Sequence, residues 1–102
     1  MRLRRKLYLI CYDICGEGSE RRLRRVYRLL RAYGEHVQRS VFRCVLSDRQ
    51  LAELEQALQP VLDHRRDQVL FVPLGSADSN SGWQGWTMGV PLDAPERTVR
   101  II

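Results

Sequence analysis

The hydrophobic pattern first predicts a strand at residues 6–14 (KLYLICYDI), a short apolar run rich in Tyr, Ile and Leu that is broken by Asp13. Alternate positions of a strand point to opposite faces of its sheet. One face carries Leu7, Leu9 and Cys11, and the other carries Tyr8, Ile10 and Tyr12. Because both faces are apolar, we expect this strand to be covered on both sides.

A helical period follows a glycine-containing turn at residues 15–19 and extends from Glu20 to Tyr33. Ser19 is the expected N-cap and Gly34 the expected C-cap. The buried stripe, at positions i, i+3, i+4 and i+7, is expected to be Leu23, Val26, Tyr27 and Leu30. The opposite face carries Arg21, Arg24, Arg25, Arg28 and Arg31.

The remaining pattern predicts a strand pair, a second helix and a further strand. Residues 35–47 are rich in β-branched and aromatic residues, but no Gly or Pro inside them marks the reversal. Ser47 or Asp48 caps the second helix, whose apolar face is Leu51, Leu54, Leu58 and Val61. Residues 68–74 (QVLFVPL) form the next strand, and Pro73 indicates a sheet edge or the last residue of the strand.

This order predicts an α+β chain with the ferredoxin-like βαββαβ arrangement and an additional C-terminal strand. Residues 1–74 are expected to be the nucleic-acid-binding domain, and residues 75–102 a flexible loop and a strand (98–102) that packs on a partner protomer. The arrangement puts both helices on one face of the sheet, although the first strand is apolar on the other face as well. A twofold homodimer that stacks these open faces resolves the conflict.

The basic residues are concentrated in the first half of the chain. The formal net charge is +5, and residues 1–50 hold 13 of the 17 basic residues but 5 of the 12 acidic ones. A helix face with this many arginines suits a polyanion such as nucleic acid, with Arg39 and Arg43 extending it. The alternative is a solvated helix face, but such faces usually mix both signs, and Glu20 is the one acid between Gly18 and Gly34.

Asp13 is the main candidate for chemistry, because it is an acidic residue between an apolar strand and a flexible loop. A carboxylate at such a position can hold Mg²⁺ or Mn²⁺, and the twofold axis of a dimer would supply a second one. The alternative is that Asp13 only caps the turn. Ser40 and Phe42 are candidate accessory residues, although packing is the favoured role of Phe42.

Other sites and locations are less well supported. A zinc site formed by Cys11, Cys15, His36 and His64 is an alternative with weak ligand spacing. The odd number of cysteines, with no evident signal peptide and no membrane-length apolar segment, indicates reduced thiols in a cytoplasmic protein.

Three segments resemble the CRISPR-associated endoribonuclease family often called "Cas two": YLICYDI at 8–14, RRLRRVYRLLRAYGEHVQRSVFRC at 21–44, and the LSDRQLAELEQAL helix followed by VLFVPL. The resemblance covers residues 6–74. It implies a ferredoxin-like homodimer that acts in spacer acquisition, bridges dimers of the CRISPR integrase and holds duplex DNA on its basic surface.

The resemblance also bears on chemistry. Some members of the family are metal-dependent endonucleases on single-stranded RNA or duplex DNA. The metal-binding aspartate of the family falls on Asp13, its basic residues in the region of Arg21, Arg22 and Arg24, and its SVF motif on residues 40–42. A toxin-type, VapD-like ribonuclease on the same fold is the alternative function.

Overall fold

The computed structural model describes residues 4–77, 85–90 and 99–101. Its main body is an antiparallel sheet of four strands in the order β2-β3-β1-β4. In chain order the elements are β1 (Arg5–Asp13), α1 (Ser19–Tyr33), β2 (Gly34–Gln38), β3 (Val41–Ser47), α2 (Asp48–Leu58) and β4 (Gln68–Ser76). This is the predicted ferredoxin-like arrangement, which is therefore confirmed.

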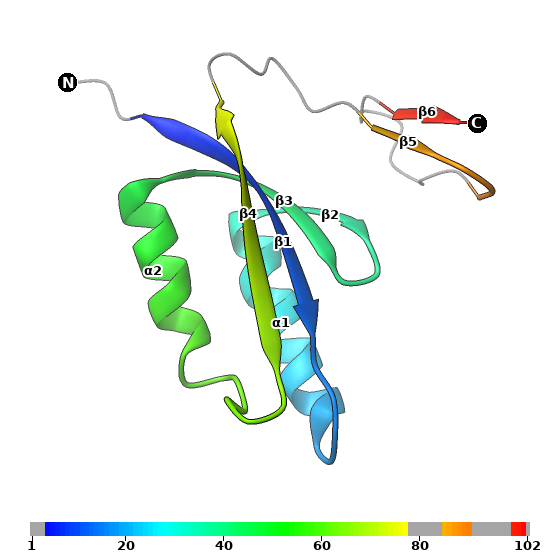
Figure 1. The fold of residues 1–102 in the computed structure, drawn as a ribbon. Helices are drawn as coiled ribbons and strands as arrows, with labels where there is room; N and C mark the ends of the chain where they lie inside the picture. The colour runs from blue at the N-terminus through cyan, green and yellow to red at the C-terminus, as the bar shows by residue number, and fades with distance from the viewer. Residues whose placement is uncertain (1–3, 78–84, 91–98, 102) are drawn as a thin grey trace.

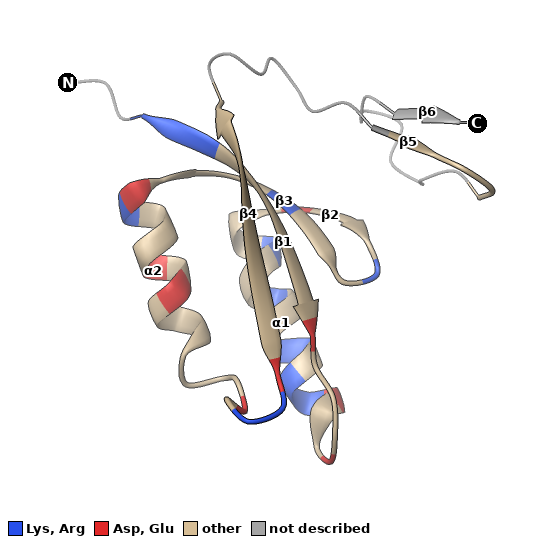
Figure 2. Ribbon diagram, in the orientation of Figure 1, with Lys and Arg blue, Asp and Glu red and all other residues tan. Residues whose placement is uncertain are grey.

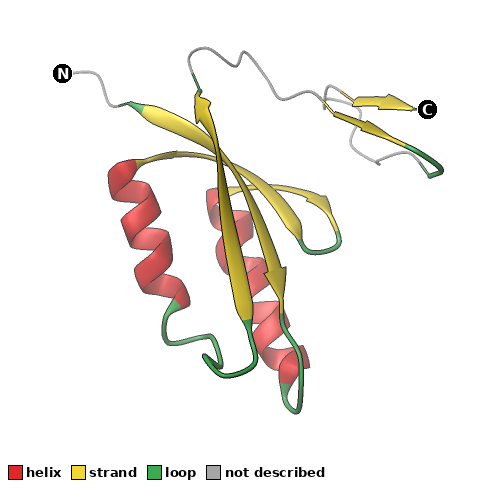
Figure 3. Cartoon of the chain, viewed as in Figure 1, coloured by secondary structure: helices red, strands yellow, loops and turns green. Residues whose placement is uncertain are grey.

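Both helices cover the same face of the sheet (Figures 1 and 3). The core lies between them and the inward side chains of the three longer strands, with Phe42, Ile10, Leu30 and Leu54 fully buried. Ser47 caps α2 through a reciprocal pair of hydrogen bonds with Gln50, which fixes the start of that helix. Neither helix in the described part of the chain is long and apolar enough to cross a membrane.

The ends of α1 differ from the prediction. The N-cap is Gly18, in the left-handed conformation with φ 73°, and Ser19 is the first helical residue. Gly34 is the C-cap, as predicted, but its backbone is extended and starts β2 directly. A Cβ at Gly34 would meet the carbonyl oxygen of Arg43 and the sulfur of Cys44, so the close approach of β3 requires glycine there.

The buried stripe of α1 is narrower than its sequence predicted. Val26 and Leu30 are fully buried and Tyr27 is partly buried, as expected. Leu23, however, is 42% exposed, because it lines an open groove beside the end of β1. The prediction that Leu23 belongs to the buried stripe was therefore wrong.

The strand reversal that the sequence left open lies at Arg39 and Ser40, between β2 and β3. β4 is an edge strand, as Pro73 indicated, and it continues to Ser76.

Near the C-terminus, residues 85–87 form a strand (β5, Gly85–Thr87) where a loop was expected, and it pairs in parallel with β6 (Val99–Ile101). The terminal strand is thus confirmed, whereas residues 78–84 and 91–98 of the expected flexible loop lie outside the described residues.

Neither of the helices in the described residues lies on the second face of the four-stranded sheet. Cross-strand partners share a face, so the register places the following residues on this helix-free face: Leu7, Leu9, Cys11, Val41, Arg43, Val45, Leu70 and Val72. All but Arg43 are apolar, and Leu70 is 52% exposed. One chain therefore leaves an apolar sheet face partly open to water.

Candidate nucleic-acid interface

An open groove of about 730 Å³ lies between α1, the end of β1 and the β2–β3 turn. We call it the α1 groove. Its polar and charged lining residues are Asp13, Arg24, Arg28, Arg39 and Ser40. Its apolar and aromatic lining residues are Tyr12, Ile14, Leu23 and Tyr27. The fold thus brings the candidate aspartate together with three of the candidate arginines and with Ser40.

Asp13 is exposed at the last position of β1, in register with Gln68 of β4. Strand alternation puts it on the same side of the sheet as Leu9 and Cys11. Asp13 therefore lies at the boundary between the α1 groove and the helix-free face.

The donor set in the described part of the chain does not make a complete metal site. No three His, Cys, Asp or Glu side chains of the described residues come together in a geometry suited to a metal ion. Within the described residues, Asp13 is the one carboxylate that lines the α1 groove, and three guanidinium groups line it as well. A hard cation prefers several oxygen ligands, so among the described residues Asp13 by itself does not make a complete site.

The residues of the zinc alternative are engaged elsewhere. The sulfur of Cys15 lies 3.1 Å from the carbonyl oxygen of Arg66, and Nε2 of His64 lies 2.8 Å from the carbonyl oxygen of Gln59. The ring of His36 packs against Phe42 with a centroid distance of 5.0 Å. The described structure thus gives the zinc alternative no support.

The β2–β3 turn is fixed against the end of β1. The hydroxyl of Tyr12 donates a hydrogen bond of 3.1 Å to the carbonyl oxygen of Arg39, and Nε2 of His36 lies 2.8 Å from the same oxygen. The backbone N–H of Tyr12 donates to the carbonyl oxygen of Ser40 at 3.0 Å. Burial, and then the neighbouring Tyr27, raise the pKa of Tyr12, so its hydroxyl keeps its proton and remains a donor at neutral pH. These bonds hold Arg39 at the groove.

The arginines of α1 divide into groups. Arg24 and Arg28, one turn apart, line the α1 groove, whereas Arg21 and Arg25 are exposed outside it. Arg31 is exposed at the last turn, where its Nη1 donates to the hydroxyl of Tyr27 at 3.0 Å. Figure 2 shows the contrast between the helices: the charged positions of α1 are mainly basic and those of α2 mainly acidic. Of the two helices, α1 therefore carries most of the basic residues, although Lys and Arg also lie at the start of β1 and in the loop before β4.

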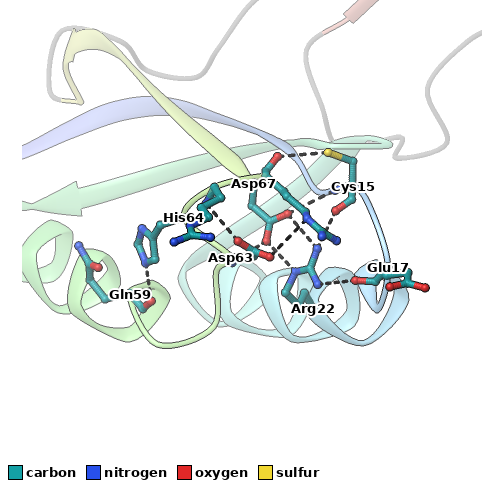
Figure 4. Close-up of polar contacts among 9 residues, drawn as sticks. Cys15, Glu17, Arg22, Gln59, Asp63, His64 and Asp67 are labelled. Atoms are coloured by element: carbon teal, nitrogen blue, oxygen red, sulfur yellow. Dashed lines mark hydrogen bonds and ion pairs between the residues drawn. The ribbon is translucent and has the colours of Figure 1, made fainter.

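Arg22 differs from its neighbours because it is part of the internal structure. Its Nε donates to Asp67 at 2.8 Å, and its two Nη atoms donate to the carbonyl oxygens of Glu17 (2.9 Å) and Cys15 (2.7 Å) (Figure 4). Asp67 also accepts the backbone N–H groups of Cys15 and Asp63, at 3.3 and 2.8 Å. We call this set of hydrogen bonds the Arg22–Asp67 latch. It connects the loop that follows Asp13 to the residue that precedes β4.

The carboxylate of Asp67 is fully buried. Burial raises the pKa of Asp67, but the hydrogen bonds from Arg22, Asp63 and Cys15 outweigh burial and lower it overall. The carboxylate is therefore charged at neutral pH and holds Arg22 in place. Because the guanidinium of Arg22 is engaged in this latch, the surface available to a ligand does not depend on it.

Two other candidates lie outside the groove. Phe42 is fully buried, with its ring 5.4 Å from that of Tyr27, which leaves no free ring face for a base. Arg43 lies on the helix-free face, 3.6 Å from the carboxylate of Glu35 on β2. Any contact that Arg43 makes with a ligand is thus separate from the α1 groove.

Sequence reasoning missed three features of this region. Leu23 and Tyr27 line the groove, although helical spacing predicted that both belong to the buried stripe, and Ile14 lines it from the strand end. Asp67 had no signal, because its partner Arg22 is 45 residues away. The spacing of Arg24 and Arg28, one turn apart beside Leu23 and Tyr27, was the available clue to the groove.

The comparisons with known proteins agree with this fold. The family model described as CRISPR associated protein Cas2 matches residues 6–81. A CRISPR-associated endoribonuclease Cas2 of Thermodesulfovibrio yellowstonii is 45% identical over 67 residues, which cover 66% of this chain and 70% of the relative. One from a Synechocystis species is 36% identical over 97 residues, 94% of this chain and 98% of the relative.

A solved structure of Streptococcus pyogenes Cas2 superposes with a TM-score of 0.64 at 31% identity, covering 68% of this chain and 86% of that one. The family match and these relatives confirm the resemblance seen in the sequence. The chain belongs to the CRISPR associated protein Cas2 family.

Proposed function

We propose that this chain acts in CRISPR spacer acquisition as a homodimer that binds duplex DNA and bridges integrase subunits. The observation that carries the proposal is the gathering of Arg24, Arg28 and Arg39 in one groove beside the exposed Arg21 and Arg25. Few acids neutralise this surface, because Glu20 is the only acidic residue of α1.

The physical basis is electrostatic. Guanidinium groups bind phosphate oxygens bidentately, and each neutralised phosphate releases condensed counterions. Such contacts position a backbone without reading its sequence, which suits a protein that holds duplexes of any sequence.

A variant with Arg24→Glu and Arg28→Glu tests the proposal. The matched control carries Arg49→Glu and Arg65→Glu, the same charge change at exposed arginines outside the groove. We expect the first variant to bind duplex DNA at least about tenfold more weakly near 0.1 M salt. A dimer of this variant would lose four phosphate contacts, two from each protomer. The magnitude of the slope of log affinity against log salt concentration should therefore fall by about 3 to 4.

Fluorescence anisotropy with one labelled duplex, titrated at several salt concentrations, measures both quantities. If the groove variant and the control bind equally well, the α1 groove is not part of the binding surface.

The proposed dimer covers the helix-free face. An open apolar face of a small sheet is normally buried against another element, and residues 4–77, 85–90 and 99–101 of one chain offer no second layer of helices. A twofold contact would bury Leu9, Val45 and Leu70 of both copies. Because Asp13 lies at the boundary of that face, the same contact would bring it toward the partner subunit's Asp13.

The exposed position of Asp13 in the groove favours a second activity, a metal-dependent endonuclease on single-stranded RNA or duplex DNA. The names of the curated relatives, CRISPR-associated endoribonuclease, support it. Asp13 and the partner subunit's Asp13 would hold Mg²⁺ or Mn²⁺. Such an ion would lower the pKa of a bound water molecule and offset the negative charge of the phosphate. Arg24 and Arg28 would orient the backbone beside them.

Asp13→Asn tests this second activity, with Glu20→Gln as a control that removes one exposed carboxylate from α1. We expect Asp13→Asn to abolish metal-dependent cleavage of labelled single-stranded RNA and duplex DNA while duplex affinity stays within about twofold of the parent, since it removes no phosphate-binding group. Cleavage by Asp13→Asn at the parental rate would contradict the assignment.

A further inference from the structure

Two ridges run side by side along α1, at the wall of the α1 groove. Leu23 and Tyr27 are four residues apart, as are Arg24 and Arg28, and all four line the groove. Side chains at i and i+4 lie one above the other on a helix, so the first pair forms an apolar ridge and the second a cationic ridge. Ile14 extends the apolar ridge from the end of β1.

Ile14 and Tyr27 of the apolar ridge pack against the core, but the exposure of Leu23 is not explained by it. Leu23 is 42% exposed between two arginines on a strongly basic helix, where a polar residue would avoid that exposure. Tyr27 is partly buried, and its ring is fixed edge-on to His36 and Phe42 at centroid distances of 5.2 and 5.4 Å. The ridge is therefore a preformed apolar surface rather than a loose side chain.

A regular duplex does not use such a surface. Its bases are stacked inside, and it presents phosphates and the polar edges of its bases to a protein. In a single-stranded segment the base faces are free, and proteins bind them with apolar and aromatic side chains while cations follow the backbone.

Building on the proposed nucleic-acid-binding function, we infer that the apolar ridge seats an unstacked base of a single-stranded segment, while the cationic ridge holds phosphates of the same strand. The groove volume of about 730 Å³ falls in the range of small-molecule sites, so the groove has room for a single base. The site thus distinguishes single strands from duplexes, and the contact of a base with Leu23 accounts for the difference in affinity.

Two oligonucleotides of ten units test the inference: oligothymidylate, and an abasic phosphodiester of the same length and charge. Each is titrated against the parent, Leu23→Ala and Leu23→Met. Leu23 is partly exposed and alanine favours helices, so Leu23→Ala is expected to fold. The parent should bind oligothymidylate about fivefold or more tightly than the abasic strand.

Leu23→Ala should reduce that ratio about threefold or more, whereas Leu23→Met, which keeps an apolar side chain, should retain it. Equal binding of the two oligonucleotides by the parent, or an equal loss on both in Leu23→Ala, would overturn the inference. Neither result would contradict the proposed duplex binding. That proposal fails only if the variant with Arg24→Glu and Arg28→Glu binds duplex DNA as well as its control.

Discussion

Replacing Asp67 with alanine should cost more stability than any other single carboxylate removal in the described structure. The side chain of Asp67 is fully buried and accepts four hydrogen bonds, two of them from backbone N–H groups. Alanine leaves these donors without their acceptor. The loop that follows Asp13 would then lose its anchor on β4.

The size of the loss follows from which donors can reach water. The N–H of Cys15 is exposed and can be hydrated, whereas the N–H of Asp63 is partly buried, and an unpaired buried donor costs about 1–3 kcal/mol. With the charge-assisted bonds also lost, we expect Asp67→Ala to lower the free energy of unfolding by about 2–4 kcal/mol. For a domain of this size that lowers the melting temperature by about 10–25 °C.

Thermal and urea unfolding followed by circular dichroism measures the effect. Asp63→Ala is the control, because it removes a carboxylate from the same loop whose ion pair with Arg66 is long (3.8 Å) and partly exposed. We expect it to cost at most about 1 kcal/mol. If Asp67→Ala lowers the free energy of unfolding no more than the control does, the Arg22–Asp67 latch does not stabilise the fold as described.

Three further predictions concern the same interactions and the core. The pKa of Asp67 is lowered in the folded state, so the charged carboxylate stabilises the fold above the unfolded pKa, and this stabilisation is lost as pH falls through the folded pKa. The difference in unfolding free energy between the parent and Asp67→Asn, read from urea midpoints, should therefore shrink below about pH 4. Burial raises the pKa of Cys44 to about 11, so iodoacetamide at pH 8 should label the exposed Cys15 first and Cys44 only on unfolding, as mass spectrometry would show; similar rates in the folded protein would contradict this. Gly34→Ala should destabilise by about 1–3 kcal/mol, because the new methyl group meets β3, and an unchanged urea midpoint would be inconsistent with that contact.

Regular periodicity predicted most of the fold. The apolar run of β1 and the helical spacing of α1 each have a local cause, so the sequence was sufficient to place these elements, and it narrowed the cap of α2 to Ser47 or Asp48. The β2–β3 turn was not predictable, because no Gly or Pro marks it. Arg39 adopts φ 20° where Tyr12, 27 residues away, donates a hydrogen bond to its carbonyl oxygen.

The candidate site was predicted in its residue types but not in their grouping. Helical spacing gives the arginines of α1 equivalent roles, yet Arg22 is held by Asp67 whereas Arg24 and Arg28 line the groove. Only contacts distant in sequence distinguish them. Likewise, helical spacing cannot show where the core ends, so Leu23 was assigned to the buried stripe although it lies beyond it.

The central claim is that the helix-free face is buried against a second copy, which completes both the site at Asp13 and the basic surface. Sedimentation equilibrium of the parent, Leu70→Glu and the control Gln56→Glu, at tens of micromolar protein, tests it most directly. The account predicts twice the 12.0 kDa chain mass for the parent and the control, and a single-chain mass for Leu70→Glu, whose new charge lies on that face. A parent protein that remains a single chain at these concentrations would contradict the claim.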